Sequence, residues 1–236
     1  KSSKETGFIY AVQESIRANL QAFPKNTNIN FSFITFNQNI QFFNLSQKNS
    51  VPQILVLSDI SDTFLPLSSN SLLVNYRKSQ ESIDKLIDLL PSLCSESDED
   101  ICTVSAIRCA AMIMKSTGGK MLLFQTSNPS AQPGALKGRF KSEFIGTSRE
   151  RELYLPQISY YTDMAKDLSK HHISVDFFIA ATKERFIDVG SLMPLANLTG
   201  GQIYFYSHFQ YQNDRIKLNN EIFRILTRTN CTNAVV

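Results

Sequence analysis

Apolar residues recur along this chain with two different periods, and the two periods alternate. Stretches with an apolar side chain every three or four residues predict helices, whereas short runs rich in aromatic and β-branched residues predict strands. The predicted helices are Phe8–Phe23, Ser79–Leu90, Thr103–Lys115, Pro156–Lys170, Phe186–Leu198 and Asp214–Thr227. The predicted strands are Asn30–Phe36, Ile40–Leu45, Gln53–Leu57, Met121–Gln125, Ile173–Ile179 and Gln202–Tyr206.

Two of these strands, Met121–Gln125 and Ile173–Ile179, are apolar along nearly their whole length. Strands that are buried on both faces have this composition, so the pattern predicts an α/β fold, a mostly parallel sheet with helices on both faces. Turn-forming residues between the first two strands predict one antiparallel hairpin. This order is typical of a von Willebrand factor A-like fold. Such a fold has a central strand before its first helix, and we expect that strand to be missing from this chain.

Composition narrows the class of protein. Hydrophobic residues make up 42% of the 236 residues, enough for a sizeable core, and the formal charge of +3 is too small to indicate a nucleic-acid partner. No apolar run approaches the length of about 20 residues that a transmembrane helix needs. The cysteines form no CxxC pair, which favours buried thiols over metal ligands or disulfides. They are Cys94, Cys102, Cys109 and Cys231.

The segment Gln53–Asn75 is the most informative part of the chain, because an acidic turn and a long apolar run follow its strand. The carboxylates of Asp59 and Asp62 share that turn, and without further ligands they are expected to cap the next segment. A solvated loop would not carry so many large apolar groups, so the run either packs on its own domain or is covered by another protein. The partner-interface candidates are Phe64, Leu65, Leu72, Leu73 and Val74.

A second candidate surface lies in the long segment between residues 126 and 153, which has little periodicity. Segments of this length without regular structure are often functional. Basic residues alternate there with glutamates, and this pattern fits either a solvated face or a patch that binds lipid headgroups or acidic sorting signals. The candidates for contact with a membrane or an acidic signal are Lys137, Arg139, Lys141, Arg149 and Arg151.

Few residues indicate catalysis or metal binding. The chain contains neither GxxxxGK[ST] nor GxGxxG, and no serine lies in a GxSxG elbow. An A-type metal site needs an aspartate after a later strand, but Gln125 occupies that place, and a neutral amide is a poor ligand for a hard cation. We therefore expect a non-enzymatic chain without a metal or cofactor. A metal-dependent A-type adhesion or complex-assembly domain remains the alternative.

Short motifs in a fixed order carry a resemblance to a known family. They are Phe33–Phe36, Ile40–Leu45, Leu57–Pro66 with Leu72–Asn75, Thr117–Lys120 with Phe124–Thr126, Val175–Phe178, and Thr199–Gly201 with Tyr204–Tyr206. In this order the chain resembles the trunk domain of the cargo-adaptor subunit of the COPII inner coat. The match to the GTPase-activating subunit of the same coat is weaker, because the Leu57–Pro66 and Leu72–Asn75 motifs belong to the adaptor.

The resemblance implies a non-enzymatic role in transport from the endoplasmic reticulum (ER) to the Golgi. It implies a heterodimer with the GTPase-activating coat subunit, capture of cargo export signals and SNAREs, and peripheral contact with the ER membrane from the cytoplasm. The family's zinc finger lies outside this chain, so no zinc is assigned to it. The resemblance also predicts that residues 1–229 form the trunk and that residues 230–236 begin a truncated β-sandwich segment.

Overall fold

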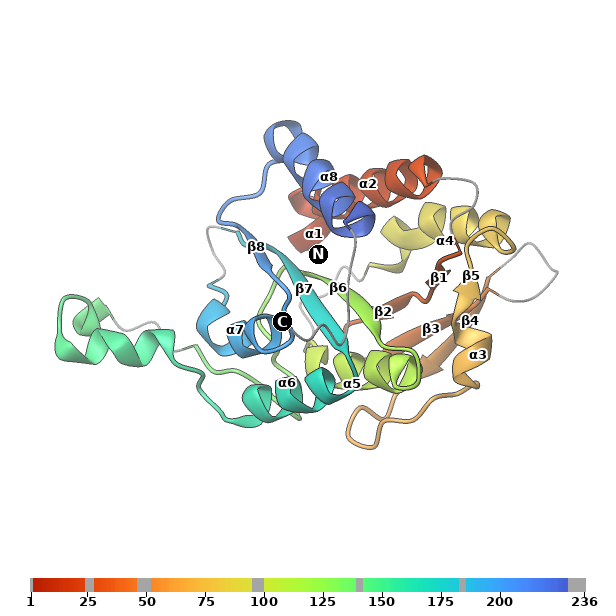
Figure 1. The fold of residues 1–236 in the computed structure, drawn as a ribbon. Helices are drawn as coiled ribbons and strands as arrows, with labels where there is room; N and C mark the ends of the chain where they lie inside the picture. The colour runs from red at the N-terminus through yellow and green to blue at the C-terminus, as the bar shows by residue number, and fades with distance from the viewer. Residues whose placement is uncertain are drawn as a thin grey trace.

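A computed structural model describes residues 2–23, 28–45, 52–94, 100–138, 142–182 and 186–228. The predicted β-sandwich segment at residues 230–236 lies outside these ranges. The described chain combines a parallel sheet, two antiparallel sheets and helices on both sides of them (Figure 1). None of its described helices has both the length and the apolar character needed to cross a bilayer.

The parallel sheet has the order β6-β7-β8 and consists of Gly119–Gln125, Ile173–Ala180 and Ile203–Tyr206. Its central strand β7 alternates between two cores. Val175, Phe177 and Ile179 pack with α5 (Thr103–Met114), α6 (Tyr160–Lys170) and α7 (Val189–Asn197). On the other face, Phe178 and Ala180 pack with α2 (Phe8–Ala22) and α8 (Tyr211–Thr227). The sheet is therefore covered on both faces, as the apolar strands predicted (Figure 1).

The antiparallel half differs from the expected single hairpin. Strands β2 (Ile34–Phe36), β3 (Ile40–Asn44) and β4 (Gln53–Leu57) form one antiparallel sheet, so the hairpin gains a third strand. The predicted strand over residues 30–36 is divided, because its first part, β1 (Asn30–Phe31), pairs instead with β5 (Val74–Asn75). No strand lies between β2 and β6 within the described residues.

Helix α4 (Gln80–Leu93) continues past Pro91, where the sequence predicts its end. A proline inside a helix leaves the carbonyl four residues earlier without its usual donor. Here that carbonyl belongs to Ile87, and it accepts a hydrogen bond of 2.9 Å from the side-chain amide of Gln13 on α2. A side chain distant in the sequence thus satisfies the carbonyl that Pro91 leaves free, and the helix gains one more turn.

The remaining elements are short. Helix α1 (Ser2–Glu5) precedes α2, helix α3 (Ser69–Leu72) precedes β5, and the 3₁₀ helices η1 (Ser142–Phe144) and η2 (Ser148–Tyr154) follow β6. Residues 142–155, here called the arm, project from the body of the molecule (Figure 1). The expected helix over residues 156–170 begins only at Tyr160, and the backbone N–H of Gln157 ahead of it donates to the hydroxyl of Ser191.

Candidate interaction surfaces

The acidic turn after β4 is held by its own hydrogen bonds. One carboxylate oxygen of Asp59 accepts hydrogen bonds from the backbone N–H of Ser61 at 3.0 Å and from its hydroxyl at 2.6 Å, and it also accepts one from the N–H of Asp62. These bonds, the one from the Ser61 hydroxyl above all, lower the pKa of Asp59. The turn therefore uses the carboxylate of Asp59 for local capping, as the sequence predicts.

The apolar run after this turn faces largely inward. Leu72 is 1% exposed and Val74 is 4% exposed, and each packs into a core cluster. Leu65 and Leu73 are half-buried against the same core as Leu72, whereas Phe64 is 55% exposed. This placement corrects the expectation for Leu72 and Val74, whose side chains serve the core because α3 and β5 turn the chain back over the antiparallel sheets. Of the five candidates, only Phe64 exposes most of its side chain.

A polar clamp fixes the base of the arm. The side-chain amide of Gln157 bonds both backbone groups of Lys137, donating to the carbonyl at 2.7 Å and accepting from the N–H at 3.2 Å. The same amide donates to Asp188 at 2.7 Å, and Asp188 is 1% exposed. Asp188 also accepts hydrogen bonds from the N–H and hydroxyl of Ser191 at the start of α7. The backbone of the exposed Lys137 is thereby linked, through Gln157, to Asp188 at the start of α7.

The arm itself carries mixed charge. The guanidinium carbon of Arg149 lies 4.0 Å from the ring centroid of Phe144. Arg149 also forms an ion pair of 3.1 Å with Glu152, and the hydrogen bond to this carboxylate raises the pKa of Arg149. Arg151 is exposed. Counting Glu143 and Glu150 as well, the arm has two arginines against three glutamates, a net charge of −1. Arg149 and Arg151 therefore do not form a basic patch by themselves, and Arg139 and Lys141 lie outside the described residues.

Large apolar side chains are exposed on the arm and on the segment that returns from it. They are Ile145 at 54%, Tyr154 at 68%, Leu155 at 50% and Ile158 at 36% exposure. Sequence reasoning missed this feature, because the charged residues around these positions indicated a solvated or anion-binding segment. The sequence feature that could have indicated these exposed side chains is the presence of large apolar residues beside glycine and charged residues in a segment without periodicity. The arm thus offers a mixed apolar and charged surface.

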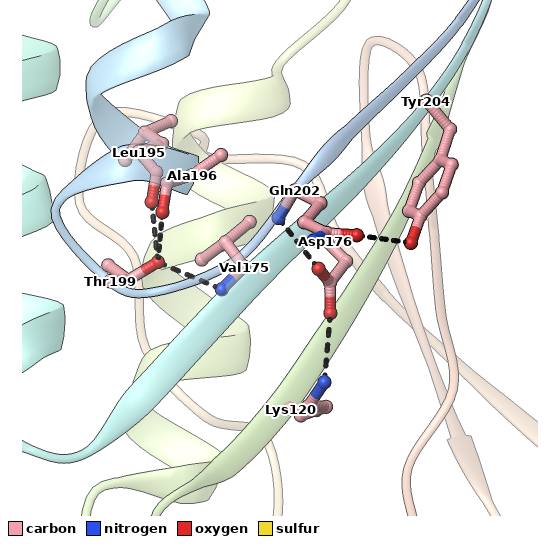
Figure 2. A network of polar contacts seen from close by, with 8 residues as sticks. All are labelled: Lys120, Val175, Asp176, Leu195, Ala196, Thr199, Gln202 and Tyr204. Atoms are coloured by element: carbon pink, nitrogen blue, oxygen red, sulfur yellow. Dashed lines mark hydrogen bonds and ion pairs between the residues drawn. The ribbon is translucent and has the colours of Figure 1, made fainter. Parts of the chain in front are cut away.

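A network of polar contacts links the strands of the parallel sheet (Figure 2). Asp176 on β7 is 2% exposed, and its carboxylate accepts a hydrogen bond of 2.8 Å from the N–H of Gln202. Its other oxygen lies 3.5 Å from the ammonium of Lys120 on β6. The hydroxyl of Tyr204 on β8 donates to the side chain of Gln202 at 2.6 Å. A buried carboxylate needs such partners, and this network links β6 and β7 to Gln202, the residue that precedes β8.

The Thr199-Gly200-Gly201 motif is also explained by packing. The hydroxyl of Thr199 donates to the carbonyl of Leu195 at 2.6 Å and accepts from the N–H of Val175 on β7 at 3.0 Å (Figure 2). A Cβ atom at Gly201 would lie 1.9 Å from the carbonyl oxygen of Val175. The motif therefore fastens the end of α7 to β7 where no side chain fits.

Metal and nucleophile chemistry find little support in the described ranges. Gln125 is 3% exposed, and its amide donates to the carbonyl of Ser127 at 2.5 Å. No group of three His, Cys, Asp or Glu side chains in the described part of the chain could hold an ion. Burial raises the pKa of Cys102 to about 11 and that of Cys109 to about 12, so both thiols are protonated at neutral pH.

Taken together, the fold and these sites define a von Willebrand factor A-like α/β domain that offers surfaces for binding. The sequence pattern of the Sec23/Sec24 trunk domain family matches residues 1–226, and the chain belongs to this family. It is 34% identical to protein transport protein SEC24 A of Arabidopsis thaliana over 100% of this chain and 22% of that protein. It is 35% identical to Sec24A of Bos taurus over 95% of this chain and 20% of that protein.

A solved structure agrees with this assignment. The human COPII-coat protein Sec24c superposes with a TM-score of 0.85 at 30% identity, covering 95% of this chain and 30% of that one. This likeness confirms the predicted α/β class and the resemblance drawn from the motifs. The chain spans about a fifth of the length of the curated relatives it matches.

Proposed function

We propose that this chain is the trunk of a COPII cargo adaptor, a non-enzymatic module that binds the GTPase-activating coat subunit. In this role it contributes to the contacts with cargo export signals, SNAREs and the ER membrane during ER-to-Golgi transport. The observation that carries the proposal is the family match along residues 1–226, together with relatives that are named Sec24 transport proteins. A cytoplasmic location, peripheral on the ER membrane and on COPII vesicles, follows from the same role.

Phe64 is the residue of the apolar run that fits a partner surface best, because more than half of its side chain is exposed beside a buried neighbourhood. We expect Phe64→Asp to weaken co-purification with the GTPase-activating coat subunit at least about tenfold while the midpoint of unfolding stays unchanged. The matched control is Ile216→Asp, which charges a similarly exposed apolar residue on α8. Equal co-purification of wild type and Phe64→Asp would remove this run from the interface.

The basic residues that precede the arm in the sequence are proposed to face anionic groups. Lys137 is exposed and anchored through its backbone, and Arg139 and Lys141 follow it in the sequence. The triple reversal Lys137→Glu, Arg139→Glu and Lys141→Glu should reduce sedimentation with phosphatidylserine vesicles several-fold at low salt. Reversal of Arg149 and Arg151 is the control, and its effect should be smaller because the arm is already mixed in charge. Equal effects of the two variants would contradict the assignment.

The non-enzymatic role, without a metal or cofactor in this chain, is part of the proposal. A buried amide at Gln125 in place of a carboxylate supports it, since hard divalent ions prefer charged oxygen ligands. Calorimetric titration of the chain with Mg²⁺ should therefore give no saturable heat. Saturable binding would favour the alternative, a metal-dependent A-type adhesion or complex-assembly domain.

A further inference from the structure

Strand β4 has one edge without a strand partner. It is the last strand of the antiparallel sheet β2-β3-β4, and within the described residues it pairs only with β3. The backbone of residues 54–57 has no further backbone partner in the described ranges. In an antiparallel pair, alternate residues of an edge strand direct their N–H and C=O groups away from the neighbouring strand. β4 therefore presents a row of hydrogen-bonding groups with which a further strand can pair.

The side chains of β4 divide between its two faces. Leu55 and Leu57 pack with the core cluster that contains Phe42 of β3. Ile54 and Val56 point to the opposite face, where they are 39% and 55% exposed. One face of β4 thus fixes the strand to the core, and the other offers two apolar side chains beside the open edge.

This edge lacks the features that usually keep an exposed strand from pairing. Proteins protect such edges with lysine or proline in the strand, or with a β-bulge that twists the edge away. β4 has the sequence QILVL, which contains neither lysine nor proline, and its five residues pair one-to-one with Ile40–Asn44 of β3 without a bulge. Exposed apolar side chains on an unprotected edge favour association with a further segment.

The composition and the length of the edge define the segment that fits it. No residue of β4, and none opposite it in β3, is charged, so the edge offers no charge for a partner to neutralise. Ile54 and Val56 lie two positions apart, which matches apolar side chains at alternate positions of an extended segment. Interfaces between folded proteins use about 20–30 residues a side, so a five-residue edge favours a linear segment over a second copy of the chain.

We propose that the open edge of β4 binds an extended, uncharged segment of another protein as an added β-strand. Backbone hydrogen bonds along the edge hold the segment, and contacts with Ile54 and Val56 select apolar side chains at every second position. This surface uses other residues than those proposed for the coat partner and for anionic groups, and the inference does not rest on that proposed function.

The first test uses a fluorescein-labelled peptide as the added strand. It carries the β3 sequence Ile40–Asn44 between glycine-serine flanks, because these residues already match β4 on its other edge. Fluorescence anisotropy follows its binding to the 236-residue chain. Two control peptides carry N-methyl groups on alternate amides, one on the odd-numbered and one on the even-numbered residues, so that each loses the N–H donors of one edge.

Only one edge of the peptide can pair with β4. The unmodified peptide should therefore bind saturably, one control should bind at least about tenfold more weakly, and the other should keep its affinity. Equal affinities of the two controls would indicate binding without strand pairing and would overturn the proposal. The absence of saturable binding by the unmodified peptide would overturn it as well.

Hydrogen exchange and one substitution locate the bound peptide. The peptide should slow exchange at residues 53–57 and leave residues 203–206 of β8, an edge of the parallel sheet, unchanged. Val56→Lys should weaken binding at least about tenfold with an unchanged melting temperature, whereas Ile216→Lys, at a similarly exposed position on α8, should bind like wild type. Protection of β8 instead of β4, or full binding by Val56→Lys, would contradict the proposal.

Sedimentation of the chain without peptide separates a foreign segment from self-pairing. The chain should sediment as a monomer at the concentrations used for binding. A dimer that Val56→Lys dissociates would assign the edge to a second copy and would overturn the proposal.

Discussion

The apolar run at residues 60–75 and the arm at residues 142–155 show opposite relations between composition and exposure. The run has the more apolar sequence, and Leu72 and Val74 within it are almost fully buried. The arm has the more charged sequence, and its apolar residues Ile145 and Tyr154 are more than half exposed. The difference arises because α3 and β5 turn the run back over the antiparallel sheets, whereas the arm leaves the body of the molecule (Figure 1).

This comparison teaches that the content of apolar residues in a loop does not identify an interface. The exposure of the side chains depends on whether the backbone of the loop pairs with the body of the molecule. In the run, β5 pairs with β1, and Phe64 is the large apolar side chain that stays mostly exposed. The arm is fixed at its base by Gln157 and Asp188, and Ile145, Tyr154 and Leu155 on it are each at least half exposed.

The largest expected effect tests the inward half of this comparison. Leu72→Ala removes a side chain that packs with Ile40, Phe42 and Leu57, and it should lower the free energy of unfolding by about 2–5 kcal/mol. Phe64→Ala, in the same run, should change it by less than about 0.5 kcal/mol. Urea denaturation of both variants measures the difference, and equal losses would mean that the run is not divided as described.

The next effect concerns the turn that fastens α7 to β7. Gly201→Ala should cost about 3 kcal/mol, because the new methyl group meets the carbonyl of Val175 and the backbone must shift. Gly200→Ala is the matched control: it has a φ of 73° but open space around it, so only about 1 kcal/mol is expected. Thermal unfolding of the two variants compares them, and a reversed order would contradict this packing.

A smaller loss is expected when the arm is released at its base. Asp188→Ala leaves the donors of Ser191 and Gln157 without their carboxylate, and it should cost about 2 kcal/mol of stability. Limited proteolysis should then cut within residues 142–155 faster than in wild type. Asp163→Ala, which removes an exposed carboxylate on α6, is the control and should leave both readouts unchanged.

The smallest effect belongs to the arm. Arg149→Ala removes an exposed ion pair and a contact with the ring of Phe144, and exposed pairs of this kind contribute little to stability because solvent screens them. The change in global unfolding should be close to the error of the measurement. A loss comparable with that of Leu72→Ala would show that the arm belongs to the core.

Much of the architecture could be predicted from the sequence, because periodicity reports burial directly. The bounds of β4 agree with the prediction, and β6 and β7 differ from it by at most two residues. The continuation of α4 past Pro91 could not be predicted, since it depends on a hydrogen bond from Gln13, far away in the sequence. The division of the first predicted strand likewise depends on β5, which pairs with its first half.

The candidate surfaces were less accessible to sequence reasoning. The prediction of an apolar run was sound, but its orientation depends on tertiary pairing, so Leu72 and Phe64 could not be told apart in advance. The sequence predicts a segment that is irregular and charged, but it does not show that Arg149 pairs with Glu152. Gln157 and Asp188 lie in separate segments of the chain, and no local sequence pattern predicts the hydrogen bond between them.

Hydrogen exchange of the isolated chain, followed peptide by peptide, tests this comparison most directly. Amides at residues 72–76 should exchange as slowly as those of β7, because they pair and pack within the core. Amides at residues 142–155 should exchange fastest among the described residues. Fast exchange at residues 72–76 together with strong protection of the arm would contradict the account.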